Sequence, residues 1–209
     1  MIALLQGGWL ISFPGMRNPV RLKNLSLRFI PLYCVGLAIL VFHPPERDVL
    51  ARVLPVIGFG VILRGWGAGH LVKNDALTVT GPYAHLRHPL YGGTILIATG
   101  FALAVGGWVS LLALVAIWPW FALHYFPRKE RSESRRLERL YGERFERYRS
   151  AVPALWPRLR AFADLDQEGT KAPARGWALD RYSENNELGT LLAVCAGLLV
   201  FWLRATRAA

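Results

Sequence analysis

The run from Leu90 to Leu123 contains no charged side chain and constrains the fold more than any other feature of the sequence. About 20 apolar residues cross a bilayer as a helix, so the run is too long for one span. Gly106 and Gly107 lie near its middle, where glycine permits a tight turn. We therefore predict a helical hairpin with membrane spans at 90–105 and 108–126.

The rest of the chain repeats this alternation of apolar and charged segments. Charged residues gather at 17–28, 128–149 and 158–187, and the chain is 53% apolar with a mean hydropathy of +0.28. That is too apolar for an average soluble domain. Further spans are expected at 29–42, 49–69 and 188–203, with Arg64 extending to water near the end of its span. The predicted fold is all-α: one domain over 1–209, a polytopic membrane bundle of about five transmembrane helices with a cytoplasmic amphipathic helix. The apolar segment 1–13 is expected to be interfacial and not a signal peptide.

The net charge of +11 is explained by membrane topology. The basic residues lie at the ends of apolar segments, so anionic headgroups and orientation signals account for them better than nucleic acid does. With positively charged loops inside, the 70–88 loop and the 129–149 helix both face the cytoplasm. We therefore predict a multi-pass integral protein of a bacterial inner membrane or equivalent, with membrane lipids and no nucleic acid as partners.

A loop framed by Pro82 and Pro89 leads into the uncharged run. It presents Arg87, His88 and Tyr91: a guanidinium fork for anions, a titratable imidazole and a phenol. Anchoring at the membrane surface would explain these residue types but not the rigid frame of two prolines. His85 and His88 alone do not make a metal site without a third ligand, so no metal is expected.

The 129–149 helix carries an apolar stripe that Glu130 and Glu133 continue toward the membrane. A carboxylate on the packed side of a helix needs a partner. Glu133 is therefore either half of an ion pair, for example with Arg136, or part of a functional site. The stripe consists of Leu137, Leu140, Tyr141, Arg144, Phe145 and Tyr148.

These motifs, in this order, resemble the isoprenylcysteine carboxyl methyltransferase family and its bacterial relatives, to which the phospholipid N-methyltransferases look related. The resemblance covers about residues 55–158 and is loose in the extension from 160 to 209. It rests on Gly81-Pro82-Tyr83, Arg87-His88-Pro89-Leu90-Tyr91, Glu133-Ser134, Gly142 to Tyr148, and Val152-Pro153. Two departures stand out: Ser134 replaces a second acidic residue, for which Glu130 is a candidate substitute, and Phe145 replaces a tyrosine.

The resemblance implies S-adenosylmethionine as the cofactor, held at the cytoplasmic edge of the membrane. It also implies that Lys129 faces the methyl acceptor. We expect Arg87 and Lys129 together to orient the polar head of the acceptor. The residues it implies for cofactor binding are Lys73, Asp75, Ala76, Leu77, Thr78, Tyr83, His88, Pro89, Leu90, Tyr91 and Glu133.

The function expected from the resemblance is S-adenosylmethionine-dependent methyl transfer to a lipidic or lipid-soluble acceptor. O-methylation of an isoprenylcysteine-type carboxylate and N-methylation of a phospholipid-type amine both remain open. One alternative is an NADPH-dependent membrane reductase related to the sterol reductases, although Gly92-Gly93 follow Tyr91 where those enzymes carry Gly-Asp. The other is a non-catalytic membrane protein, which Ser134 would favour.

Overall fold

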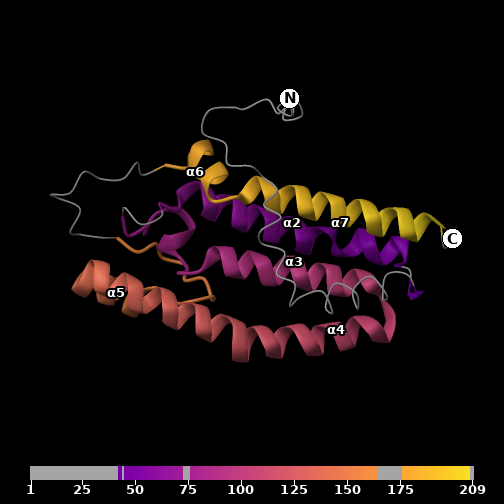
Figure 1. The fold of residues 1–209 in the computed structure, drawn as a ribbon, viewed down its shortest axis with the longest axis horizontal. Coiled ribbons are helices and arrows are strands. Elements are labelled where there is room, and N and C mark those ends of the chain that lie inside the picture. Colours follow the sequence, from indigo (N-terminus) through magenta and orange to yellow (C-terminus); the bar gives the residue numbers. More distant parts are fainter. Residues whose placement is uncertain (1–41, 44, 73–75, 164–175, 208–209) are drawn as a thin grey trace, which may run out of the picture.

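The computed structural model describes residues 42–43, 45–72, 76–163 and 176–207, and the secondary structure of this part of the chain is helical (Figure 1). A π-helical turn links two of the helices, and a short 3-10 turn precedes the motif Arg87 to Tyr91. The elements in order are α2 (Arg47–His70), η3 (Gly81–Ala84), α3 (Pro89–Val105), α4 (Gly107–Pro119), η4 (Trp120–Tyr125), α5 (Phe126–Ala151), α6 (Leu179–Glu184) and α7 (Glu187–Arg207).

Helix α2 lies at the centre of the bundle and packs against both α3 and α7 (Figure 1). Leu50, Val53 and Ile57 of α2 form one buried cluster with Ala104 of α3 and Val194 of α7. Small residues let α2 and α3 approach closely: a Cβ atom on Gly60 would lie 2.8 Å from the carbonyl oxygen of Gly93. The hydrophobic core of the bundle therefore joins helices distant in the sequence.

The structure contains the hairpin predicted for the uncharged run. Helix α3 ends at Val105 and α4 begins at Gly107. Gly106 and Gly107 have φ angles of 79° and 55°, in the left-handed region that favours glycine. Pro89 stands in the first turn of α3, where its missing N–H costs no helical hydrogen bond.

The expected break between a span at 108–126 and a separate helix at 129–149 is absent, and one continuous helical segment runs from α4 through η4 into α5 (Figure 1). Pro119 cannot donate a helical hydrogen bond. The helix does not end there but continues as the wider π-helical turn η4. The real interruption comes later, at Gly142, where φ is 48° and ψ is −128°.

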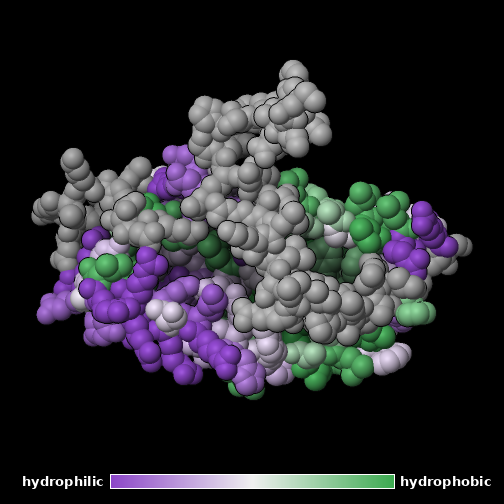
Figure 2. Space-filling model, in the orientation of Figure 1, coloured by the Kyte–Doolittle hydropathy of each residue, from purple (hydrophilic) through white to green (hydrophobic). Residues whose placement is uncertain are grey.

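Three helical segments are long and apolar enough to cross a membrane, which indicates an integral membrane protein. They are Arg47–His70, the apolar part of Gly107–Ala151, and Glu187–Arg207; Pro89–Val105 is apolar but shorter. The predicted span at 29–42, apart from Phe42, and the predicted interfacial segment 1–13 lie outside the described residues. Within the described residues the structure thus supports three candidate spans, and the predicted total of five stays a prediction. Hydrophilic residues gather over α5, at the opposite end from the apolar part of α4 (Figure 2).

The C-terminal helices bind the end of α2. Trp177 Nε1 donates to the carbonyl of Gly65 at 2.9 Å, and Asn185 Nδ2 donates to the carbonyls of Ala68 and Leu71. A Cβ atom on Gly69 would lie 2.0 Å from Trp177, so only glycine allows this approach. The glycines at the end of α2 therefore serve packing, and α6 fixes the point where the chain leaves α2.

Arg64 does not extend to water as expected. Its guanidinium forms an ion pair with Glu187 of α7, with Nε 2.7 Å from Oε1, and the side chain of Glu187 is only 4% exposed. The sequence prediction was wrong here because the partner lies far along the chain, beyond the reach of any local pattern.

Candidate functional site

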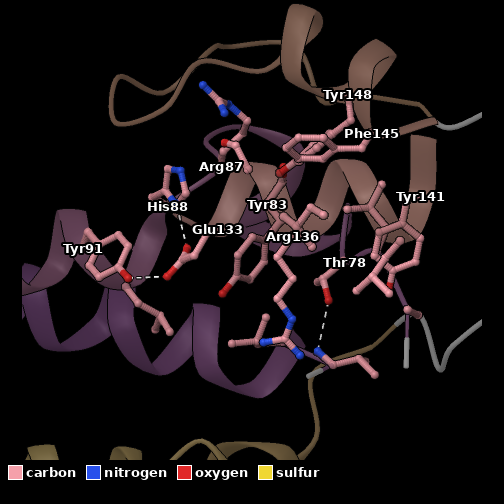
Figure 3. A pocket seen from close by; sticks show the side chains of 18 of the residues that line it. Thr78, Tyr83, Arg87, His88, Tyr91, Glu133, Arg136, Tyr141, Phe145 and Tyr148 are labelled. Carbon is pink, nitrogen blue, oxygen red and sulfur yellow. Dashed lines mark hydrogen bonds and ion pairs between the residues drawn. The ribbon is translucent and has the colours of Figure 1, made fainter. Parts of the chain in front are cut away.

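A cavity of about 550 Å³ lies where the end of α2, the start of α3 and the helix α5 meet (Figure 3). Lys73 and Asp75 lie outside the described residues. Pro89 is buried beside the cavity, and Lys129 is exposed on α5; neither belongs to the cavity wall. The other residues expected at the site line the cavity: Ala76, Leu77, Thr78, Tyr83, Arg87, His88, Leu90, Tyr91 and Glu133.

Glu133 is the only acidic side chain on the described wall of the cavity, and two neighbours hold it. The Tyr91 hydroxyl donates to Glu133 Oε1, and His88 Nδ1 lies 3.5 Å from Oε2 (Figure 3). Burial by itself would raise the pKa of Glu133, but the hydrogen bonds from His88 and Tyr91 outweigh it and keep the pKa below its usual value. Glu133 is therefore a carboxylate at neutral pH.

The ring nitrogen Nε2 of His88 has no hydrogen-bond partner among the described residues. The His88 side chain is 8% exposed, and Nε2 itself is buried. The ring also packs edge-on against Phe126, which leaves little freedom to turn. Buried polar atoms are usually paired, and a ligand is one explanation when they are not.

The apolar stripe of α5 places Glu133 at the cavity. Phe145 and Tyr148 are buried against Leu77, Val79 and Val152. The Tyr148 hydroxyl also donates to the carbonyl oxygen of Tyr83 at 2.7 Å. Burial raises the pKa of the Tyr83 and Tyr148 phenols above their usual range, so both stay protonated.

Next to this stripe, the hydroxyl of Thr78 accepts a hydrogen bond from the backbone N–H of Val72 at 3.0 Å. This bond joins the two ends of the segment between α2 and η3. The segment and the stripe of α5 together define two walls of the cavity (Figure 3).

Arg87 is fixed in place by several bonds. Its Nε donates to the carbonyl of Val152 at 2.9 Å, and its Nη2 lies 2.7 Å from Glu130 Oε1. Glu130 therefore serves Arg87 and does not line the cavity, which argues against its replacing the acidic residue missing at Ser134. Arg87 Nη1 is buried without a partner among the described residues and is the donor left for a ligand.

Two charged residues of the cavity wall, Arg136 and Arg64, were not assigned to the site from the sequence. Arg136 was considered only as an ion-pair partner of Glu133, and Arg64 only as a residue at the end of a span. Figure 3 shows the Arg136 side chain extending past Tyr83 toward the segment with Thr78. Its position three residues after Glu133 puts both on one helix face, a signal that could have found it. No local signal marks Arg64.

The described residues contain no group of three or more side chains able to hold a metal ion. His85, which the sequence places three residues before His88, is bonded through Nδ1 to the carbonyl of Arg158 at 2.9 Å.

Comparison with known proteins shows what this chain is similar to. Residues 60–144 match the phospholipid methyltransferase family. Over this region the chain is similar to membrane methyltransferases of the phospholipid and isoprenylcysteine type. No solved structure matches the chain.

Among similar proteins is the protein-S-isoprenylcysteine O-methyltransferase of Schizosaccharomyces pombe, 30% identical over 157 residues, 72% of this chain and 60% of that protein. The nickel-cobalt-cadmium resistance protein NccN of Alcaligenes xylosoxydans xylosoxydans is 39% identical over 136 residues, 61% of this chain and 62% of that protein. The cobalt-zinc-cadmium resistance protein CzcN of Cupriavidus metallidurans is 37% identical over 91 residues, 43% of this chain and 39% of that protein. The chain thus spans less than two thirds of each relative. The resemblance to isoprenylcysteine methyltransferases inferred from the sequence is confirmed.

Proposed function

We propose that this chain is an S-adenosylmethionine-dependent methyltransferase that acts on a lipidic acceptor at the cytoplasmic face of the membrane. The observation that carries the proposal is the ionised Glu133, held by His88 and Tyr91 in a cavity at the start of α3. Perturbed titratable groups in a cavity are typical of binding and catalytic sites.

The residues present fit such a cofactor. A carboxylate with aromatic rings beside it favours a positively charged group, and Tyr83 and Tyr91 line the cavity with Glu133. The volume of about 550 Å³ lies in the usual range of small-molecule sites. The unpartnered His88 Nε2 would gain a partner from a bound molecule. The residues proposed to hold the cofactor are those expected from the family resemblance, with Lys73 and Asp75 completing the segment before Ala76.

When bound, S-adenosylmethionine supplies an electrophilic methyl group on a sulfonium. The protein has to align the acceptor with that group and exclude water. Glu133 would balance the positive charge, and the apolar wall formed by Leu137 and Phe145 would keep water out. Arg87, through Nη1, and Lys129 would orient an anionic or polar head, while the acceptor's acyl or prenyl tail lies between the spans.

The test is calorimetric binding of S-adenosylmethionine and, separately, NADPH to detergent-purified protein, wild type and Glu133→Ala. Saturable binding of S-adenosylmethionine that the variant loses is the expected result. Binding of NADPH alone would assign the chain to the reductases. Binding of neither would leave a non-catalytic membrane role.

The acceptor is identified by a second assay with radiolabelled S-adenosylmethionine. A prenylated cysteine with a free carboxylate and vesicles containing phosphatidylethanolamine are offered in parallel. A carboxylate nucleophile needs no base, whereas an amine must first lose a proton when protonated. Label in the first product means O-methylation; label in the second means N-methylation. Arg87→Ala should lower turnover with either acceptor, and unchanged methylation would remove Arg87 from the site.

A further inference from the structure

Two apolar side chains are displayed on the segment that follows α5. Trp156 is 82% exposed and Leu159 is 99% exposed, more than any other large apolar residue of the described chain except Phe42. We propose that residues 154–160 form an interfacial anchor that inserts Trp156 and Leu159 into the headgroup region of an anionic membrane leaflet. This segment lies beyond the part of the chain matched by the methyltransferase family.

The segment is held rigidly. The backbone N–H of Arg158 donates to the carbonyl of His85 at 3.0 Å, and the His85 ring bonds back to the carbonyl of Arg158 at 2.9 Å. Arg158 Nη1 donates to the carbonyl of Ala151, and the N–H of Phe162 donates to the carbonyl of Ala84. Trp156 and Leu159 are thus presented by a fixed backbone, which makes their exposure a property of the fold.

The segment also lies at the level where the membrane surface is expected. Ala154 and Leu155 pack against the buried cluster of Ile95, Phe121 and Phe126, as do Tyr91 and Tyr125 near the two ends of the long uncharged run. The N–H of His88 donates to the carbonyl of Ala154 at 3.0 Å. Figure 1 shows the chain after α5 returning to the start of α3. Tryptophan is enriched at this boundary between apolar core and water.

The positive charge around the segment favours an anionic membrane leaflet as its binding partner. Arg158 and Arg160 flank Leu159, and residues 126–163 contain eleven Lys and Arg against five Glu, a net charge of +6. Apolar side chains set among basic ones are the pattern of surfaces that bind anionic lipid. The anchor is bonded to His85 and His88, beside the cavity, so it would also hold the cavity at the depth of the lipid headgroups.

The test uses the full-length protein with Cys34→Ser and Cys195→Ser, reconstituted in vesicles of phosphatidylcholine with phosphatidylglycerol. A bimane label on Leu159→Cys reports its surroundings. The matched control is Glu143→Cys, exposed on α5 and away from the proposed anchor. We expect nitroxide-bearing lipid to quench the Leu159 label several-fold more than the control, and aqueous iodide to do the reverse.

Three results would overturn the proposal. Iodide quenching of the Leu159 label as strong as that of the control would mean that the segment stays in water. Protection from both quenchers would mean that a protein surface, not lipid, covers it. Equal lipid quenching in vesicles of phosphatidylcholine alone would remove the preference for anionic lipid. None of these readouts depends on methyl transfer, so they are independent of the proposed enzymatic function.

Discussion

The polar clusters around Glu187 and around Glu133 differ in how fully their hydrogen bonds are satisfied. In the first, the guanidinium of Arg64 uses all of its donors. Nε and Nη2 bind the carboxylate of Glu187 at 2.7 and 2.8 Å, and Nη2 also donates to Thr190. Nη1 donates to the carbonyl of Leu90 and the hydroxyl of Thr94. A guanidinium has five N–H groups, so Arg64 has none left for a ligand.

The second cluster is incomplete. The Glu133 side chain is 43% exposed to the cavity although Tyr91 and His88 bind it. His88 Nε2 and the neighbouring Arg87 Nη1 are buried without partners in the described chain. Leaving such atoms without partners is unfavourable, and a molecule bound in the cavity would supply the missing partners.

An ionisable residue within a membrane protein is by default a candidate for function. The comparison refines that rule. Arg64 also lines the cavity, but all of its hydrogen-bond donors have partners, whereas the Glu133 cluster retains unpartnered atoms. The first cluster fixes α7 to α2 and α3 and should matter for stability. The second should matter for binding. The predictions below test this separation.

The largest effect is expected from Glu187→Ala. The change leaves Arg64 buried without its counter-charge, and breaking a buried pair in this way costs about 3–5 kcal/mol. Thermal unfolding in detergent should show a large drop in Tm, with S-adenosylmethionine affinity of the folded fraction unchanged. Thr190→Val, which removes one long bond of the same cluster, is the control and should cost about 1 kcal/mol. Lost affinity at unchanged Tm would place the pair in the site.

The next effect is expected from Glu133→Gln, which keeps the shape of the side chain and removes its charge. Losing a hydrogen bond or contact to a charged group costs about 1.5–3 kcal/mol, which corresponds to about a 10- to 100-fold weaker Kd for S-adenosylmethionine. Calorimetry measures the Kd and thermal unfolding the stability. A Tm loss as large as that of Glu187→Ala, with an unaltered Kd, would contradict the separation of the two clusters.

What the sequence could predict was local. The hairpin turn followed from Gly106-Gly107 within an uncharged run, and Glu133 was placed on the packed face of its helix by spacing alone. The meeting of Glu133 with His88 and Tyr91 came only from the family resemblance, because more than 40 residues separate the two motifs in the chain. The structure adds the atoms that interact: the Tyr91 hydroxyl with Glu133 Oε1, and His88 Nδ1 with Glu133 Oε2.

Long-range pairs and competing local signals account for what the sequence did not reveal. Arg64 and Glu187 lie 123 positions apart, and each alone reads as a charge near the end of an apolar segment. A span ending at 126 and a separate helix from 129 were expected, but the helical segment continues from α4 through the π-helical turn η4 into α5. Glu130 lies on the same helical face as Glu133. Its carboxylate forms an ion pair with Arg87 and does not line the cavity.

A smaller effect is expected from Tyr148→Phe. It removes the hydrogen bond from the buried hydroxyl to the carbonyl of Tyr83, a change worth about 1 kcal/mol. Because this bond joins α5 to the cavity turn, stability should fall slightly and the Kd for S-adenosylmethionine should rise less than in Glu133→Gln. Phe145→Tyr, which restores the family's tyrosine at a buried position, is a second test of the cavity wall that Phe145 and Tyr148 form on α5. If Tyr148→Phe raised the Kd as much as Glu133→Gln does, the placement of the cavity wall, and not the charge of Glu133, would dominate binding.

The smallest effect is a pH dependence of stability. Hydrogen bonds from His88 and Tyr91 hold the pKa of folded Glu133 below its ordinary value of 4.5, after burial has opposed them. A carboxyl whose folded pKa is depressed stabilises the fold fully above its unfolded pKa, and the contribution is lost as pH falls through the folded pKa. The Tm difference between wild type and Glu133→Gln should therefore be constant near neutrality and shrink below pH 4.5. Because Glu133 is partly exposed, solvent screening keeps this difference small. Thermal unfolding of both proteins across that range measures it. A difference that grew on acidification would mean that Glu133 is protonated in the folded state, and the cavity would then lack the negative charge on which cofactor binding is proposed to depend.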